Sequence, residues 1–175
     1  MARESTFMNM FLTLFIISIV SSASLGYIYE FTKEPIAKAS LEKKINAIKE
    51  VVPAFNNNPI EEMKEVVISP DEKLIFYPAK NNSVLVGTAI ETFSNKGYGG
   101  KIKLMVGFLP DGSIYDISVL EQKETPGLGD KMQKSKSDFS LQFRGKRPSI
   151  FKLQVKKDGG DVDAITAATI SSRAF

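Results

Sequence analysis

The fold is decided by the stretch KIKLMVGFLPDGSIYDISVL, which occupies residues 101–120. In its first half, one set of side chains (Ile102, Leu104, Val106 and Phe108) alternates with another (Lys101, Lys103, Met105 and Gly107). This period of two predicts a β-strand over residues 101–109. Asp-Gly at positions 111–112 is a strong signal for a tight hairpin turn, so residues 114–120 return as the partner strand.

Further segments extend this hairpin into a larger domain. Short runs rich in β-branched or aromatic residues predict strands over residues 65–69, 74–77, 84–92 and 150–155. Residues 132–143 are predicted to be helical, with Phe139 and Phe143 at the i, i+4 spacing of helix neighbours. Together these segments predict an α+β domain, with a mainly antiparallel sheet packed with helices.

The amino-terminal segment predicts a membrane anchor. No charged residue lies between Glu4 and Glu30, and residues 7–29 are strongly apolar. A transmembrane helix needs about 20 such residues, so the segment fits one crossing. A cleaved signal peptide is the alternative, because Ser21, Ser22 and Ala23 are small residues suited to cleavage. We favour a retained anchor because the apolar character continues past Ala23 and the preceding residues are barely basic.

A second helix is expected after the anchor. Pro35 suits the first turn of a helix, and apolar residues recur at helical spacing after it (Ile36, Leu41, Ile45, Ile48 and Val52). We therefore predict an amphipathic helix over about residues 34–52, following the membrane helix after a bend. The predicted divisions are a stub and transmembrane anchor at 1–32, an amphipathic helix and linker at 33–62, and the α+β domain at 63–175.

Composition narrows the possible functions. The chain has no Cys and no His, which removes disulfides, thiolate metal sites and the commonest general base. Hydrolase triads and zinc chemistry are therefore not expected, and we predict no metal site. The net charge is only +3 and the lysines are scattered, which does not favour a nucleic-acid surface. Redox chemistry would require an added cofactor.

The carboxyl-terminal segment carries a candidate modification site. Residues 163–169, DAITAAT, resemble the flavin-attachment motif Asp-x-x-(Ser/Thr)-Gly-Ala-Thr, whose final Thr is esterified to the phosphate of FMN. That residue is Thr169, at an expected helix start where a hydroxyl residue is available as the cap and free N–H groups favour a phosphate. Ala167 replaces the Gly of the motif, which matters if the position needs a positive φ and not if it needs only small size. A plain helix cap is the alternative interpretation.

A second motif follows the hairpin. Residues 121–131, EQKETPGLGDK, together with Tyr98-Gly99-Gly100, resemble the FMN-binding domain of the G subunit of Rnf complexes. That domain is similar to the C subunit of sodium-translocating NADH:quinone oxidoreductase. The resemblance runs from about Gly97 to Phe175 in the same order along the chain. Gln122 stands where the family pattern often has His.

The resemblance implies a membrane complex that passes electrons between ferredoxin and NAD while it moves Na⁺ or H⁺. This chain would be an electron-carrying subunit of that oxidoreductase, without substrate turnover of its own. The cofactor would be FMN, attached to Thr169 by a separate flavin transferase that uses FAD as donor. The expected recognition and contact residues are Asp163, Thr166, Ala167 and Ala168 in the attachment motif, and Glu124, Thr125, Gly127 and Leu128 as noncovalent contacts.

The resemblance also bears on topology. A count of the basic residues that flank the anchor (Arg3 before it; Lys33, Lys38, Lys43 and Lys44 after it) would place the domain in the cytoplasm. The family implies the reverse, with a cytoplasmic stub and an extracytoplasmic FMN-binding domain at residues 63–175. Two alternatives stay open: the C subunit of the sodium-translocating quinone reductase, and an anchored scaffold protein without flavin.

Overall fold

The structure is a computed structural model that describes residues 6–69 and 72–175. The chain separates into two compact units, residues 1–42 and 43–175. The elements are α1 (Phe7–Val51), β1 (Lys64–Ser69), β2 (Glu72–Asn81), β3 (Val84–Gly97), β4 (Gly100–Phe108), β5 (Ile114–Glu121), the 3₁₀ helices η1 (Gly129–Met132), η2 (Phe139–Phe143) and η3 (Lys156–Asp158), and α2 (Thr169–Ala174).

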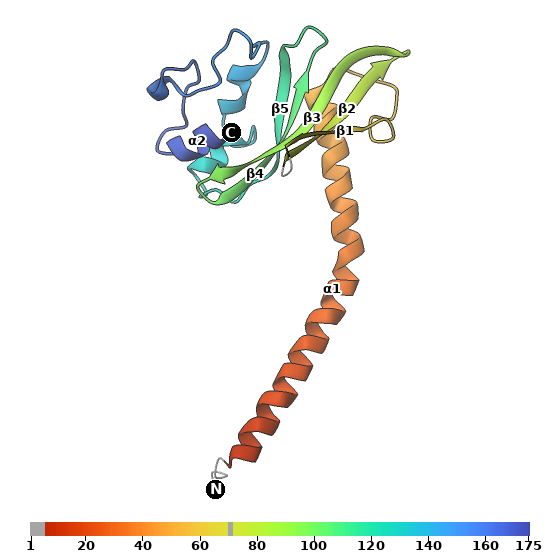
Figure 1. The fold of residues 1–175 in the computed structure, drawn as a ribbon, viewed down its shortest axis with the longest axis vertical. Coiled ribbons are helices and arrows are strands. Elements are labelled where there is room, and N and C mark those ends of the chain that lie inside the picture. Colours follow the sequence, from red (N-terminus) through yellow and green to blue (C-terminus); the bar gives the residue numbers. More distant parts are fainter. Residues whose placement is uncertain (1–5, 70–71) are drawn as a thin grey trace. The chain divides into compact units, whose positions relative to one another are not determined.

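The five strands form one antiparallel sheet in the order β1-β2-β3-β4-β5 (Figure 1). The β4–β5 turn closes as its Asp-Gly signal predicts. The Gly112 N–H donates to the Leu109 carbonyl over 2.9 Å, and the Ser113 N–H donates to the Asp111 carboxylate over 3.0 Å. The predicted α+β fold with a mainly antiparallel sheet is confirmed.

The last turns of α1 cover one face of this sheet. Ile48 and Val51 are buried in a core with apolar residues of the strands, including Tyr77 and Met105. The helix approaches so closely that a Cβ added to Gly107 would lie 1.5 Å from the Val51 carbonyl oxygen. Gly107 is therefore required for the contact between α1 and β4.

A buried carboxylate ties the same helix end to the sheet. Glu91 of β3 accepts a hydrogen bond from the Tyr77 hydroxyl over 3.0 Å. It also contacts Lys44 of α1 at 2.9 Å and Lys103 of β4 at 3.1 Å. Burial alone raises the pKa of Glu91, but these hydrogen bonds outweigh it, so the pKa lies below its ordinary value.

The covering segment, residues 122–175 after β5, packs on the opposite face of the sheet. Figure 1 shows η1, η2 and α2 gathered on one side of β4 and β5. Their apolar residues form two clusters with the strands: Ile102, Leu104, Met132, Ile165, Ala168 and Ala174 in one, and Ile114, Ile117, Phe143, Val155 and Val162 in the other. The alternation predicted for residues 101–109 therefore feeds a core on each face.

The separate helix predicted to begin near Pro35 is wrong, because α1 runs unbroken from Phe7 to Val51 with Pro35 inside it. Pro35 has no N–H to donate to the carbonyl of Phe31, yet the helix continues through it. The predicted apolar stripe is buried only near its end: Ile48 lies in the core, whereas Ile36 and Leu41 are exposed.

The first part of α1 has the properties of a membrane span. It includes an 18-residue window with a mean hydropathy of 2.0, none of it buried within the protein. Within residues 6–69 and 72–175 it is the one helix long and apolar enough to cross a bilayer. This supports the predicted single-pass anchor.

Two other predictions are wrong. Residues 132–143 contain the end of η1 and all of η2 and do not form one α-helix, because Ser137 bonds to the local backbone. Its hydroxyl donates to the Lys131 carbonyl over 2.5 Å and accepts the Phe139 N–H over 3.2 Å, an alternative to helical bonding. Residues 150–155 form turns and one isolated bridge from Val155 to Val162.

A second buried carboxylate links β5 to the covering segment. Asp116 is 4% exposed and contacts Lys134 and Arg144, each at 2.6 Å. Lys134 also pairs with Glu50 of α1 at 2.7 Å. Burial alone raises the pKa of Asp116, but hydrogen bonds from Arg144 and Lys134 outweigh it, so its pKa lies below the ordinary value.

We expect Asp116→Asn to lower the free energy of unfolding by about 2 kcal/mol, because a buried ion-pair network loses its anion. Urea denaturation would measure this, with Asn at the exposed Asp138 as the control. The contribution is fully present above the unfolded pKa of about 4 and is lost as the pH falls through the lower folded pKa. A difference between the wild type and the variant that persisted unchanged at pH 2 would contradict this assignment.

Candidate functional site

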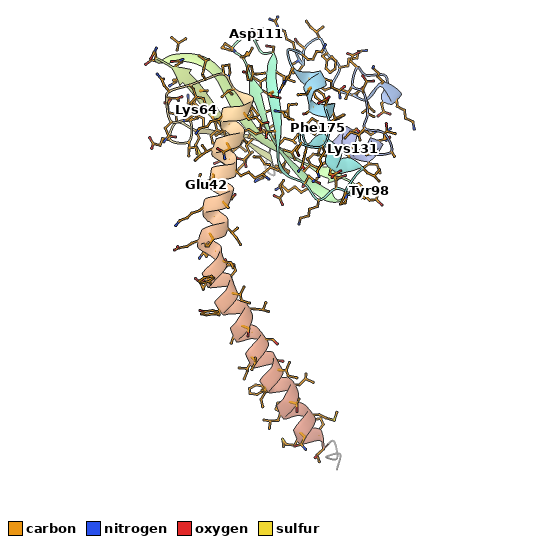
Figure 2. The ribbon with its side chains drawn as sticks, turned by 180° about the vertical axis from the view of Figure 1, so that it is seen from behind. Glu42, Lys64, Tyr98, Asp111, Lys131 and Phe175 are labelled. Carbon is orange, nitrogen blue, oxygen red and sulfur yellow. The ribbon has the colours of Figure 1, made fainter. Side chains whose placement is uncertain are left out.

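The two sequence motifs meet at one end of the sheet. A pocket of about 490 Å³ lies between the β3–β4 turn, the loop after β5 and the start of α2. Figure 2 shows Tyr98 of that turn at the same end of the domain as Lys131. The lining residues are Tyr98, Glu124, Thr125, Leu128, Gly129, Ala167, Ala168, Thr169, Ile170 and Ser171. This volume is within the usual range of small-molecule sites.

Glu124 joins the three segments that build the pocket. Its side chain is buried, with the residue only 5% exposed. One carboxylate oxygen accepts the Gly99 N–H over 2.8 Å, and the other accepts the Ser171 hydroxyl of α2. Both oxygens are therefore occupied within the protein, so Glu124 shapes the pocket wall. Its predicted contact with flavin stays a prediction.

Glycines of the β3–β4 turn and of the loop after β5 make room for this carboxylate. A Cβ added to Gly129 would lie 2.4 Å from the Ser171 Oγ and 2.7 Å from Glu124 Oε2. One added to Gly97 would lie 2.7 Å from Glu124 Oε1. Gly127, by contrast, has open space around it and a φ of 78°, which a turn of this kind requires.

The attachment loop, residues 163–168 of the predicted attachment motif, ends directly at the pocket. Thr169 is the first residue of α2, as predicted, and is half-buried. The predicted hydroxyl cap is wrong, because Ala168 occupies the N-cap position and makes no side-chain bond. Ser172 holds the loop instead. Its Oγ accepts the Ile165 N–H over 2.8 Å and donates to the Ala168 carbonyl over 2.9 Å.

Ala167 occupies a left-handed backbone conformation, with a φ of 61°. This conformation costs an L-residue about 1–2 kcal/mol and costs glycine little. The position therefore needs a positive φ, which resolves the question left open by the replacement of Gly by Ala.

The predicted residues fall into two neighbouring sites. Glu124, Thr125, Leu128, Ala167, Ala168 and Thr169 line the pocket described above. Asp163 and Thr166 line an adjacent pocket of about 360 Å³, together with Lys131 and Gln142. Gly127 lies in the loop after β5 without lining either pocket.

Four wall residues were not among the predicted contact residues: Tyr98, Gly129, Ile170 and Ser171. Tyr98 is 71% exposed, and Ile170 is also exposed at the pocket. Tyr98 and Ile170 present apolar surface beside Thr169. The Tyr98-Gly99-Gly100 motif could have identified Tyr98 from the sequence. Ser171, the partner of Glu124, carried no signal of its own in the sequence.

The arrangement suits a flat, largely apolar group held through a hydroxyl. Tyr98, Leu128 and Ile170 offer apolar walls, and Thr169 offers an aliphatic hydroxyl that can form an ester. Among residues 6–69 and 72–175, no group of three or more acidic, His or Cys side chains is placed to hold a metal ion.

We expect Ala167→Gly to raise the free energy of unfolding by roughly 0.5–1 kcal/mol, because the strain at positive φ exceeds the extra entropy that glycine gains on unfolding. Thermal or urea unfolding would measure the change. The matched control is Ala164→Gly, at an exposed position of the same loop without a positive φ. Equal destabilisation of the two variants would show that the left-handed conformation carries no strain.

The comparisons with known proteins agree with this geometry. Residues 97–175 match the FMN-binding domain family. The G subunit of the ion-translocating oxidoreductase complex of Vibrio atlanticus (strain LGP32) is 33% identical, over 91% of this chain and 81% of its own length. The corresponding G subunit of Erwinia tasmaniensis is 36% identical, over 93% and 81%. That of Haemophilus influenzae (strain PittEE) is 36% identical, over 84% and 74%. The chain therefore belongs to the family of G subunits of ion-translocating oxidoreductase complexes, which confirms the family predicted from the two motifs.

Proposed function

We propose that this chain is the FMN-carrying electron-transfer subunit of an ion-translocating oxidoreductase complex, with FMN held by a phosphoester on Thr169. The observation that carries the proposal is the meeting of two distant motifs in one pocket, with the Thr169 side chain on its wall. The match to the FMN-binding domain family over residues 97–175 supports FMN as the cofactor. When bound, FMN supplies the electron-carrying chemistry.

The residues of the pocket fit such a group. Leu128 and Tyr98 flank the pocket with apolar surface, and Thr125 adds an exposed hydroxyl at its edge. Glu124 accepts hydrogen bonds from Gly99 and Ser171, so it would hold the β3–β4 turn and α2 in place around the flavin. Gly127 and the backbone around it would lie beside the same group. These residues would bind and orient the flavin, and partly exclude water from one side.

Attachment of FMN to Thr169 involves no change of oxidation state. The Thr169 Oγ attacks the phosphorus on the FMN side of the FAD pyrophosphate, and a new P–O bond forms. The P–O bond to the AMP side breaks, AMP leaves, and the hydroxyl proton passes to a base of the flavin transferase. Asp163, Thr166, Ala167 and Ala168 would form the sequence that this enzyme recognises.

Within the complex, the chain would relay electrons between neighbouring subunits and would turn over no substrate alone. Transfer between ferredoxin and NAD, coupled to Na⁺ or H⁺ movement, is the reaction that the family resemblance favours. The relatives named as G subunits, matched over most of their length, favour this assignment over the C subunit of the sodium-translocating quinone reductase. The alternative outside the redox proteins is an anchored scaffold protein that carries no flavin.

We expect Thr169→Ala to abolish flavin loading, because the ester oxygen is lost. Two measurements check this: yellow-green fluorescence of the protein band in a denaturing gel, and the mass of the peptide containing residue 169. The matched control is Thr125→Ala, which removes a hydroxyl from the same pocket and should stay fluorescent. Fluorescence that persists in Thr169→Ala would move the attachment site, and a non-fluorescent wild type from cells with the transferase would favour the scaffold.

We further propose that residues 1–32 anchor the chain and that the soluble domain lies outside the cytoplasm. The chain has no native cysteine, so a single introduced thiol reports its own side of the membrane. Cysteine at the exposed Ser135 should react with an impermeant maleimide in cells with an intact inner membrane. Cysteine at Thr6 should react only after that membrane is permeabilised, and the opposite pattern would reverse the topology.

A further inference from the structure

We infer that Gln142 is a positioning residue for flavin loading, which clamps the attachment loop so that the Asp163 carboxylate is displayed to the flavin transferase. This inference rests on the proposed function. It concerns a residue outside both motifs, in η2 and 21 positions before Asp163.

The Gln142 amide holds the main chain of Asp163 at two points. Its Oε1 accepts the Asp163 N–H over 2.8 Å, and its Nε2 donates to the Asp163 carbonyl over 3.1 Å. A side-chain amide thus replaces the partner strand that would normally pair with both groups of one residue. The same Nε2 also donates to the Phe139 carbonyl over 2.9 Å, which fixes the orientation of the amide.

The clamp is built on a rigid element. Phe143, the next residue, is buried in the core of the covering segment. Its ring lies edge-on to Phe139, with the ring centroids 5.8 Å apart, and 5.5 Å from the ring of Phe175. Gln142 therefore fixes the main chain of Asp163 relative to the core that contains Phe143.

The Asp163 side chain does little for the fold. It is 71% exposed, and its ion-pair partner Lys156, at 2.7 Å, is also exposed. Exposed pairs of this kind contribute little to stability. A main chain fixed by two hydrogen bonds, with its carboxylate left in solvent, is the arrangement expected when another protein must read that carboxylate.

The far end of the loop is fixed independently. Ser172, buried in α2, bonds to the backbone of both Ile165 and Ala168. Between these two points, Thr166 is exposed and lines the same pocket as Asp163 and Gln142. The surface therefore fits a partner that offers a cation or hydrogen-bond donors to Asp163 while it brings the FAD pyrophosphate to Thr169.

The experiment compares rates of loading. The full-length apo-protein, made in cells without the transferase and purified in detergent, is mixed with purified transferase and FAD. Initial rates of FMN incorporation are followed by in-gel fluorescence at several concentrations of the apo-protein. The variants are Gln142→Ala, Gln142→Glu and Asp163→Asn. Gln154→Ala is the matched control, because this exposed glutamine lies in the same covering segment outside the pocket of Asp163.

We expect Gln142→Ala to lower kcat/KM for the apo-protein by about tenfold, the effect of losing two hydrogen bonds that order the loop. Gln142→Glu keeps the acceptor for the Asp163 N–H but places a carboxylate oxygen against the Asp163 and Phe139 carbonyls, so it should load no faster than Gln142→Ala. Asp163→Asn should also load slowly with an unchanged melting midpoint. Because Gln142 does not line the pocket of Thr169, the loaded Gln142→Ala protein should have the wild-type flavin absorption spectrum.

Wild-type loading rates in Gln142→Ala would overturn the inference while leaving the proposed function intact. So would a slow rate accompanied by an altered flavin spectrum or an equal loss in Gln154→Ala, since either would mean general damage to the domain. If Gln142→Ala does not fold, the loading rate of Gln142→Glu decides in the same way. A wild-type protein that takes up no flavin at all would instead refute the proposed function.

Discussion

The candidate site depends on one buried carboxylate. Glu124 is bonded by the Gly99 N–H and by the Ser171 hydroxyl, so a single side chain joins the β3–β4 turn, the loop after β5 and α2. Among the other buried carboxylates of the described residues, Glu91 and Asp116 contact lysine or arginine. Glu124 is held by neutral donors, whose geometry must therefore be accurate enough to replace its hydration. The crowded glycines around it follow from that demand.

The two faces of the sheet have different roles. On one face, the end of α1 packs against Met105 and is tied to Glu91 through Lys44. On the other face, the segment after β5 builds the pocket and carries Thr169. Because strand side chains alternate between faces, the same strand β4 serves both. The anchor attachment and the site can therefore each be packed without sharing a side chain.

The sequence was informative where a local rule decides the structure. The strands follow from alternation, and the β4–β5 turn follows from Asp-Gly. The helix expected at 132–143 failed because Ser137 bonds to nearby backbone, a competition that residue spacing does not reveal. The motifs located Thr169 and Glu124, but the use of both Glu124 oxygens depends on partners 25 and 47 positions away. The strain at Ala167 could likewise not be predicted from the sequence, because it follows from the backbone φ angle.

The proposed covalent attachment would explain why a pocket with exposed walls is sufficient for the cofactor. A cofactor held only by contacts needs a site that buries most of its surface. A phosphoester on Thr169 would remove that requirement, so the walls would need only to orient the ring. Tyr98 and Ile170 are exposed beside Thr169, so a partner protein could approach the flavin closely there. The same exposure would give the proposed flavin transferase access to the Thr169 hydroxyl beforehand. One exposed surface would thus serve loading first and electron transfer afterwards, which a closed pocket could not do.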